Sequence, residues 1–472
     1  MPDLNEPTAD DLSTLSAMVN GAVRSGDDAA PYLTEPRDVA RGRAALVLRP
    51  GNTGEVAEIV NFCAARRIGV VPYGGGTGLV GGQVMADGPL PVVVSLERMN
   101  RIRDVIPEEN ALIAEAGVIL SDIQAAAHDA GRLFPLSLAS EGSCRIGGNL
   151  STNAGGVQVL RYGNARDLCL GIEAVLPNGE ILSGLKTLRK DNTGYDLRHL
   201  LLGAEGTLGI LTAAVLKLFP IPQATVTAML AVPGPSAATT LLHRLRDLLG
   251  DQITAFELIH GNGVEFVGRF HDVVDPLNGF PAWRVLAEVV GTDQEALQEQ
   301  LETAFSSAFE DGLATDGVQA LSDAQRQEMW KLRETIPEAN RKVGAVSSHD
   351  ISLPIKSLPE FIDEANDVIS RIDSDLVTNC FGHLGDGNLH YNVFPPKGRR
   401  NQDYANRKME VKTALHDLVN AYDGSVSAEH GIGRFKAADL VTYSDPAKVT
   451  AMRSIKAALD PAGIMNPGAV LV

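Results

Sequence analysis

The sequence has few cysteines and no long apolar run. Its 472 residues include four cysteines, Cys63, Cys144, Cys169 and Cys380, none in CxxC spacing. Cysteines this sparse do not form a disulfide framework, and they fit a reducing compartment. No stretch approaches the roughly 18 apolar residues of a membrane span. The acidic N-terminus also lacks the charged and apolar regions of a signal peptide. We therefore expect a cytoplasmic protein without a membrane span.

Positive charge is also scarce. The 41 lysines and arginines are outnumbered by 59 acidic residues, and the formal net charge is −18. This balance argues against a nucleic-acid partner, because phosphate backbones are bound by concentrated Lys and Arg. A small anionic ligand is still allowed, since a local basic group can bind a carboxylate inside an acidic protein. Apolar residues make up 44% of the chain, which is ordinary globular composition.

The chain is long enough for more than one domain. Strand and helix signals alternate up to about Pro220, with strands expected over 44–50 and 68–73 and a helix over 55–67. The pattern changes near residues 220–222, and a region with long helices follows. We predict an α+β fold with domains at 1–222 and 223–415, and a C-terminal segment at 416–472 that returns to the first domain.

Glycine is abundant, and its 47 residues gather in loops. Gly76, Gly78 and Gly81 satisfy GxGxxG, but a Rossmann site also needs a helix directly after the loop. The continuation GGQVMADGPLP cannot be that helix, so NAD is not expected. Two further glycine-rich systems lie at 140–156 and 190–210. Turns between strands would explain one such loop, but three in one domain indicate a cofactor cradle.

A second constellation lies around two histidines. Asp386-Gly387 predicts a two-residue hairpin turn that places His383 opposite His390, with their Cβ atoms about 5 Å apart. Two imidazoles at that spacing can share a metal ion, and Glu429 on a glycine-flanked stretch can supply a third ligand. A His-His-Glu set leaves coordination positions open, as catalytic sites do. The alternative is a polar cross-strand pair of histidines.

Several motifs together resemble a known family. PYGGGTGL, GSCRIGGNLSTNAGG, LRYGNARDLCLGIEAVLPNGE and KDNTGYDLRHLLLGAEGTLGI are similar to the FAD-binding domain of the vanillyl-alcohol oxidase superfamily, in its D-2-hydroxyglutarate and D-lactate dehydrogenase branch. The resemblance covers nearly the whole chain. It implies an α+β FAD-binding domain, an antiparallel-sheet substrate cap and a C-terminal helical segment.

The resemblance also implies a set of site residues. FAD is expected on Pro72, Gly74, Gly75, Gly76, Thr77, Gly78, Leu79, Ser140, Gly142, Gly147, Gly148, Thr152, Gly156, Glu205, Gly206, Ile210 and Asn466. The flavin should be non-covalent, because His128 is the one His or Cys between Cys63 and Cys144 and it lies outside the loops. His383, His390 and Glu429 match positions that bind a divalent metal, often zinc.

The remaining matches concern substrate and chemistry. Asn392 and His430 match substrate-contacting positions, and Arg333 matches an arginine that pairs with a substrate carboxylate. We expect a divalent cation to lower the pKa of the substrate hydroxyl, His430 to accept its proton and the flavin to accept the hydride.

The expected activity is oxidation of a D-2-hydroxy acid to the 2-oxo acid. D-2-hydroxyglutarate is preferred over D-lactate as the expected substrate, but only narrowly. Pro337 and Ser348 stand where hydroxyglutarate enzymes usually have Thr and Lys, and these two departures weaken the preference. Rival readings are an oxygen-using oxidase of the same fold, a His-His-Glu metallohydrolase, and a non-catalytic flavin-binding protein. An electron-transfer flavoprotein and a quinone are candidate electron acceptors. A homodimer is a candidate assembly.

Overall fold

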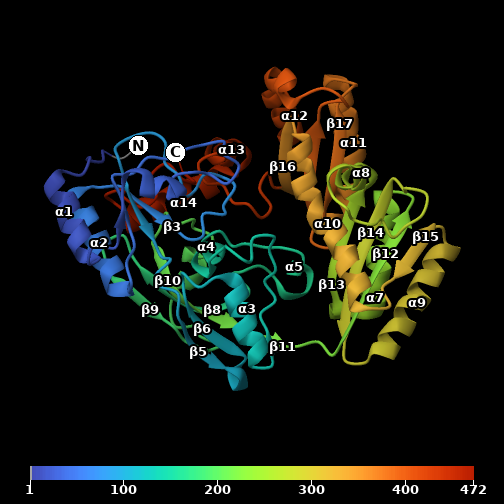
Figure 1. The fold of residues 1–472 in the computed structure, drawn as a ribbon, viewed down its shortest axis with the longest axis horizontal. Helices are drawn as coiled ribbons and strands as arrows, with labels where there is room; N and C mark the ends of the chain where they lie inside the picture. The colour runs from blue at the N-terminus through green and yellow to red at the C-terminus, as the bar shows by residue number, and fades with distance from the viewer. Residues whose placement is uncertain (1–2, 472) are drawn as a thin grey trace. The chain divides into compact units, whose positions relative to one another are not determined.

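The structure is a computed structural model that describes residues 3–471. They form two compact units, shown in Figure 1. Unit 1 contains the described residues up to Gly155, Gly163–Ile221 and those from Glu429 onward. Unit 2 contains Gly156–Tyr162 and Pro222–Ala428. Each unit has its own sheets and its own buried core.

Unit 1 begins with a four-stranded sheet. Its strand order is β1 (Val23–Arg24), β2 (Leu46–Leu48), β4 (Val92–Ser95), β3 (Val70–Tyr73). β2, β4 and β3 run parallel. Parallel strands are buried on both faces, which fits the valine-rich runs of β3 and β4. Helix α2 (Thr53–Arg66) packs its apolar stripe into the same core. Asn52 caps that helix by accepting a hydrogen bond from Glu55 N.

A five-stranded antiparallel sheet completes the main frame of unit 1. Its order is β5 (Ile102–Ile106), β6 (Ala111–Glu115), β10 (Ile210–Lys217), β8 (Cys169–Val175), β9 (Ile181–Gly184), and β11 (Phe219–Pro220) pairs with β7 (Arg132–Leu133). The other helices of the unit are α1 (Ala9–Met18), α3 (Leu120–Asp129), α4 (Ile146–Ser151), α6 (Leu197–Leu201), α13 (Ala437–Tyr443) and α14 (Pro446–Leu459), with 3₁₀ turns η1 (Gly26–Tyr32) and η2 (Pro107–Glu109).

Unit 2 is built on a seven-stranded sheet whose neighbouring strands are all antiparallel. The order is β15 (Asp316–Gln319), β12 (Ala224–Val232), β14 (Trp283–Gly291), β13 (Ile253–His260), β17 (Val377–His383), β18 (Asn388–Phe394), β16 (Ser347–Ser352). Its helices are α5 (Val159–Tyr162), α7 (Pro235–Leu249), α8 (Gly261–Phe270), α9 (Gln294–Glu310), α10 (Asp323–Val343), α11 (Leu358–Ile372) and α12 (Lys408–Ala421), with η3 (Gly250–Gln252), η4 (Ile355–Ser357) and η5 (Asn401–Arg407).

Helices α8 and α10 cover one face of this sheet. Phe266 and Val267 of α8, with Leu332 and Ile336 of α10, form one core cluster with Phe381 of β17. This packing places Arg333, the neighbour of Leu332, under the same sheet face.

These features confirm the predicted α+β class and the antiparallel sheet in the second region. After the glycine loop, the next regular element is strand β4 and not a helix, as the argument against a Rossmann site requires. The unit boundaries differ from the predicted ones. Helix α12 packs on β16 and α11 and so belongs to unit 2, and the last segment of unit 1 begins at Glu429 instead of residue 416. Among residues 3–471, no helix combines the length and apolar character that crossing a bilayer requires.

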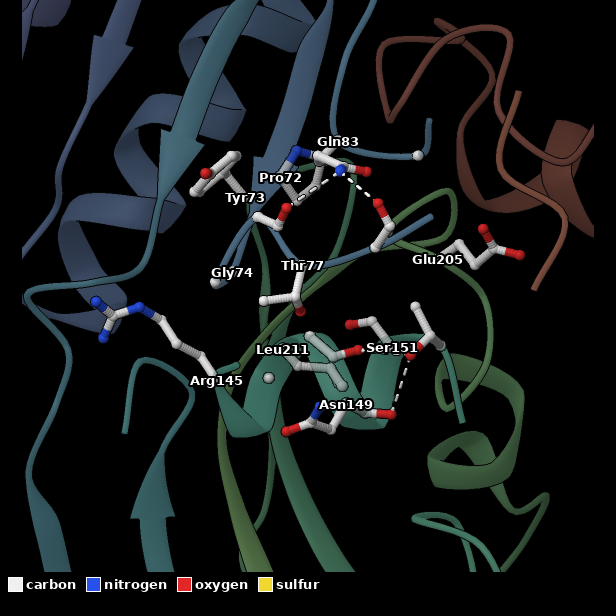
Figure 2. Close-up of a pocket in the computed structure, with 18 of the residues that line it drawn as sticks. Pro72, Tyr73, Gly74, Thr77, Gln83, Arg145, Asn149, Ser151, Glu205 and Leu211 are labelled. Carbon is white, nitrogen blue, oxygen red and sulfur yellow. Dashed lines mark hydrogen bonds between the residues drawn. The ribbon is translucent and has the colours of Figure 1, made fainter. Parts of the chain in front are cut away.

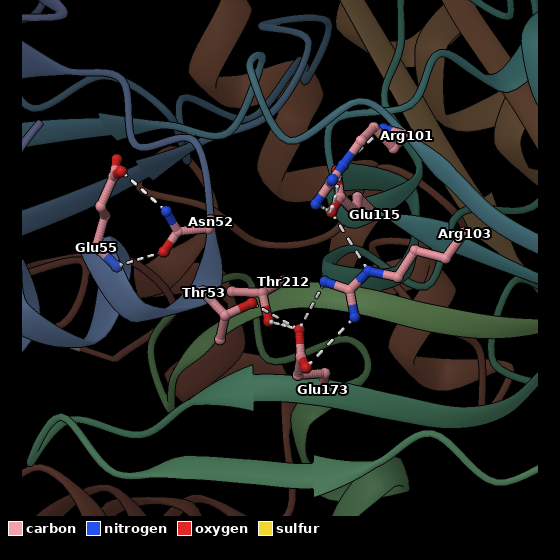
Figure 3. Close-up of polar contacts among 8 residues, drawn as sticks. All are labelled: Asn52, Thr53, Glu55, Arg101, Arg103, Glu115, Glu173 and Thr212. Carbon is pink, nitrogen blue, oxygen red and sulfur yellow. Dashed lines mark hydrogen bonds and ion pairs between the residues drawn. The ribbon is translucent and has the colours of Figure 1, made fainter.

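An ion-pair network ties the five-stranded sheet of unit 1 to helix α2 (Figure 3). The Glu115 carboxylate accepts hydrogen bonds from the backbone N and the guanidinium of Arg101, and from Arg103. Arg103 also donates to Glu173, which accepts from Thr53 at the start of α2. Burial raises the pKa of the Glu115 carboxyl, but the hydrogen bonds and charges of both arginines outweigh this and hold the pKa below its usual value.

The substitution Glu115→Gln should lower the free energy of unfolding by about 1.5 kcal/mol at pH 7, since it weakens a buried charge-assisted network whose arginines are partly screened by water. A depressed native pKa stabilises the fold above the unfolded carboxyl's pKa, and this contribution is lost as pH falls through the native pKa. The difference between variant and wild type should therefore shrink on acidification. Urea unfolding at pH 7 and at pH 3 to 4 measures it. Exposed Glu108→Gln is the control, and an equal loss at both pH values would contradict the network's role.

Candidate functional site

Unit 1 contains a cleft that is lined largely by its glycine loops. Figure 2 shows the side chains around it. Most of the residues predicted to bind the cofactor line this cleft: Pro72, Gly74, Gly75, Gly76, Thr77, Gly78, Gly147, Gly148, Thr152, Glu205, Gly206, Ile210 and Asn466. The predicted residues Leu79, Ser140 and Gly142 are not among the lining residues, and Gly156 belongs to unit 2.

Two glycine loops meet along the cleft. A Cβ atom at Gly75 would lie 2.5 Å from the carbonyl oxygen of Ser143, and a Cβ at Gly74 would lie 3.3 Å from Gly148 Cα. At Gly147, a Cβ would lie 2.6 Å from Ala116 Cβ. Only residues without side chains allow this approach. The wall of the cleft is therefore largely backbone, and its N–H groups can surround phosphate oxygens.

One side chain holds the first loop in its curved shape. Gln83 Nε2 donates to the carbonyl oxygens of Gly78 at 2.8 Å and Gly76 at 3.3 Å, as Figure 2 shows. Sequence reasoning missed Gln83, because an amide five residues beyond Gly78 has no local signature. It also missed other lining residues: Tyr73, Val80, Gly82, Leu96, Cys144, Arg145, Asn149, Ser151, Gly209 and Leu211.

The stretch that carries His430 is fixed to this cleft from within unit 1. The Glu205 carboxylate accepts the backbone N–H groups of Ile432 at 2.8 Å and Gly433 at 2.7 Å. Burial raises the pKa of Glu205, and these two hydrogen bonds oppose the shift. Asn466 Nδ2 donates to the Glu205 carbonyl oxygen at 2.8 Å. As a result, His430 and Asn466 line the same cleft as the glycine loops.

The histidine hairpin of unit 2 differs from its predicted register. β17 and β18 are joined by residues 384–387, so the turn is longer than the predicted Asp386-Gly387 pair, and His390 lies opposite Phe381 rather than His383. The shift is two residues. Since strand side chains alternate with a period of two, both imidazoles stay on one face. Their ring centroids are 5.7 Å apart.

The same face of the sheet holds the other predicted residues of unit 2. Asn392 is buried on β18 and its amide donates to the His390 carbonyl oxygen at 3.1 Å. Arg333 on α10 is buried, and its Nε donates to Glu257 Oε2 at 2.6 Å. Glu257 lies directly opposite His383 in the ladder. No sequence signal marked Glu257.

Glu429 opens the last segment of unit 1, directly after the last residue of unit 2. Ala428 is held within unit 2, where its N–H donates to the Asp350 carbonyl oxygen at 3.4 Å. Asp350 in turn lies opposite His390 in the β16–β18 ladder. Consecutive Cα atoms are about 3.8 Å apart. Glu429 therefore directly follows a residue that is hydrogen-bonded to strand β16.

Two family models match the chain. Residues 44–184 match the FAD binding domain, and residues 221–470 match the C-terminal domain of FAD linked oxidases. The first match contains two of the glycine loops that line the cleft, and the second contains the histidine hairpin and the stretch that carries His430. The glycine cradle and the family match agree on FAD as cofactor.

The substitution Gly75→Ala should abolish or strongly reduce flavin binding, because its Cβ would collide with the Ser143 carbonyl oxygen. The matched control is Gly268→Ala in helix α8 of unit 2, where an added Cβ has no atom within 4 Å. The ratio of bound FAD to protein, from visible absorbance after gel filtration, measures the effect. Full FAD occupancy in Gly75→Ala would contradict the close approach of the loops.

Curated relatives resemble the chain over most of its length. A mitochondrial D-2-hydroxyglutarate dehydrogenase of Arabidopsis thaliana is 39% identical, over 91% of this chain and 76% of the relative. A D-2-hydroxyglutarate dehydrogenase of Xanthomonas citri pv. viticola is 36% identical, over 96% of this chain and 97% of the relative. The mitochondrial enzyme of Bos taurus is 36% identical, over 97% of this chain and 82% of the relative.

Solved structures share the fold at low identity. p-Cresol methylhydroxylase with substrate bound has a TM-score of 0.75 and 16% identity, over 99% of this chain and 98% of that chain. An alkyldihydroxyacetonephosphate synthase has a TM-score of 0.74 and 18% identity, over 99% of this chain and 86% of that chain. These likenesses confirm the predicted vanillyl-alcohol oxidase-type fold. The chain belongs to the FAD-linked oxidase family, a family of FAD-linked oxidoreductases.

Proposed function

We propose that this protein is an FAD- and divalent-metal-dependent dehydrogenase that oxidises a D-2-hydroxy acid to the 2-oxo acid. The observation that carries this proposal is the position of His430, a general-base candidate that lines the same cleft as the glycine cradle. A metallohydrolase would not need a glycine cradle for a cofactor. A flavin-binding protein without catalysis would have no use for an imidazole beside it.

D-2-hydroxyglutarate is the substrate we favour, because the relatives that match nearly the whole chain are named for it. Arg333 can supply a bidentate contact to a carboxylate. D-lactate is the second candidate. Pro337 is exposed on α10 and Ser348 is exposed opposite Asn392, so neither position offers the side chain that hydroxyglutarate enzymes usually have there.

For the metal, we propose His383, His390 and Glu429 as ligands and zinc as the ion. The two imidazoles share one sheet face of unit 2. Glu429 is joined to Ala428, which is held beside the same sheet. Two imidazole nitrogens and a carboxylate oxygen suit zinc and leave a position for substrate. The donor set therefore fits a catalytic ion.

In the proposed reaction, FAD supplies the hydride acceptor and the metal supplies the positive charge that acidifies the substrate hydroxyl. His430 takes the hydroxyl proton on its imidazole. Its Nε2 lies 3.6 Å from Glu429 Oε1. Arg333 binds the substrate carboxylate, and buried Asn392 offers an amide for a polar substrate group. The glycine loops bind the flavin, with Gln83 keeping the first loop curved.

The substitution His430→Ala should lower turnover about 100-fold or more, because general-base catalysis typically contributes that much. Bound FAD should stay unchanged. The assay uses D-2-hydroxyglutarate, D-lactate and their L-enantiomers with an artificial dye acceptor, and it monitors flavin bleaching without oxygen. Exposed His243→Ala is the control. Unchanged turnover in His430→Ala would reject the base assignment, and stoichiometric hydrogen peroxide without dye would identify an oxidase instead.

Removing the metal should abolish turnover and leave the flavin in place, because the ion and FAD bind through different residues. Dialysis against a chelator should remove about one ion per chain, measured by atomic emission, while the flavin spectrum persists. Zn²⁺ or another divalent ion should restore activity. Full activity in a demonstrably metal-free preparation would overturn the metal part of the proposal.

A further inference from the structure

Glu257 is a carboxylate with no exposed surface in the middle of the unit 2 sheet. It lies on β13, directly opposite His383 on the neighbouring strand β17. Its two oxygens have different partners. Oε1 is 2.6 Å from His383 Nδ1, and Oε2 accepts from Arg333 Nε at 2.6 Å. One buried side chain thus joins the first histidine of the hairpin to the arginine of α10.

The carboxylate is ionised. Its Oε2 accepts from the guanidinium of Arg333, which stays protonated, so the two buried side chains form an ion pair. An ionised carboxylate is only a hydrogen-bond acceptor. At 2.6 Å, His383 Nδ1 must therefore carry the proton. This assigns Nε2 as the nitrogen whose lone pair is available to a cation. It is the arrangement in which a carboxylate orients an imidazole and makes it a better ligand.

The same carboxylate fixes the arginine. Because Arg333 uses Nε for Glu257, its Nη1 and Nη2 remain the pair that can grip a second carboxylate. The guanidinium carbon also lies 4.8 Å from the centre of the Phe381 ring. Phe381 in turn is 5.0 Å, centre to centre, from the ring of His390. Glu257 is therefore surrounded by one packed cluster, which consists of Arg333, Phe381 and the two histidines.

The energy of a buried ion pair indicates that Glu257 has a role other than stabilising the fold. A buried ion pair contributes little net stability compared with apolar residues of similar size, because desolvation offsets its Coulombic attraction. The neighbouring strand has a contrasting carboxylate. Glu288 on β14 is also buried and also bonds to α10, through Trp330 Nε1 at 2.8 Å, with Thr227 as a further donor. Glu288 joins the sheet to the helix. Among the described residues, it makes no hydrogen bond to either histidine or to Arg333.

We propose that Glu257 is a positioning residue that sets two binding functions at once: the tautomer of His383 toward a divalent cation, and the orientation of Arg333 toward the substrate carboxylate. The inference rests on the proposed function, and it concerns residues of unit 2 alone.

The test compares Glu257→Gln with Glu288→Gln. A glutamine at 257 has one acceptor oxygen for two donors, so either His383 or Arg333 must meet an N–H group and move away. We expect Zn²⁺ affinity, measured by competition with a chromophoric chelator, to fall 10- to 100-fold. KM for the 2-hydroxy acid should also rise about 10-fold. Glu288→Gln should lower the melting temperature and leave both values unchanged. Glu257→Asp should recover part of the Zn²⁺ affinity, because it keeps the charge.

The outcomes distinguish failure of the proposed metal site from failure of the positioning role of Glu257. If the wild type itself takes up no Zn²⁺, the metal part of the proposed function fails. If the wild type binds Zn²⁺ and Glu257→Gln binds it equally well with an unchanged KM, the positioning role fails and Glu257 is merely structural. If Glu257→Gln does not fold, the double variant Glu257→Gln/Arg333→Met leaves no uncompensated buried charge. It should still lose Zn²⁺ affinity, since His383 lacks its anionic partner, and wild-type affinity there would overturn the inference.

Discussion

The cleft of unit 1 depends on one steric constraint, the contact of two backbone loops with no side chains between them. Gly75 faces the Ser143 carbonyl at a separation that admits no Cβ atom, and Gly74 lies close to Gly148, where a Cβ would be tightly packed. The rest of the site follows from this contact. Gln83 holds the curve of the first loop, and Glu205 holds the stretch after His430. Asn466 donates to the carbonyl oxygens of Gly82 and Glu205 and so joins the C-terminal segment to both places.

Much of this arrangement could be predicted from local sequence. A glycine cluster without a following helix already excludes a Rossmann site, and in the structure turns lead from the loop to strand β4 with no helix between them. The turn and register of the histidine hairpin could not be predicted correctly from local sequence. Asp386-Gly387 predicts the tightest turn, but Gly387 sits where a Cβ would collide with the Leu353 carbonyl, and the loop is longer than predicted. Tertiary packing changed the register by two residues. The histidines kept their common face because the strand period is also two.

The residues that sequence reasoning missed act over long separations. Glu257 stands 126 positions before His383 and 76 before Arg333, and nothing in the segment ITAFELIH distinguishes it from an ordinary strand residue. Its significance appears only once β13 pairs with β17 and α10 packs beneath them. The proposed site residues show a similar contrast. His430 and the histidine pair are visible as motifs, whereas the groups that orient them are visible only in the fold.

The path of the chain has a consequence for synthesis. Unit 1 is interrupted by unit 2, and residues 464–466 complete it late, when Ile464 and Asn466 bond to Val70 beside β3. On a ribosome, the long uninterrupted stretch Pro222–Ala428 emerges and can collapse while the glycine-rich cradle still lacks its last wall. The cofactor cleft therefore cannot be complete until residues 464–466 have left the ribosome, long after strand β3, to which they bond.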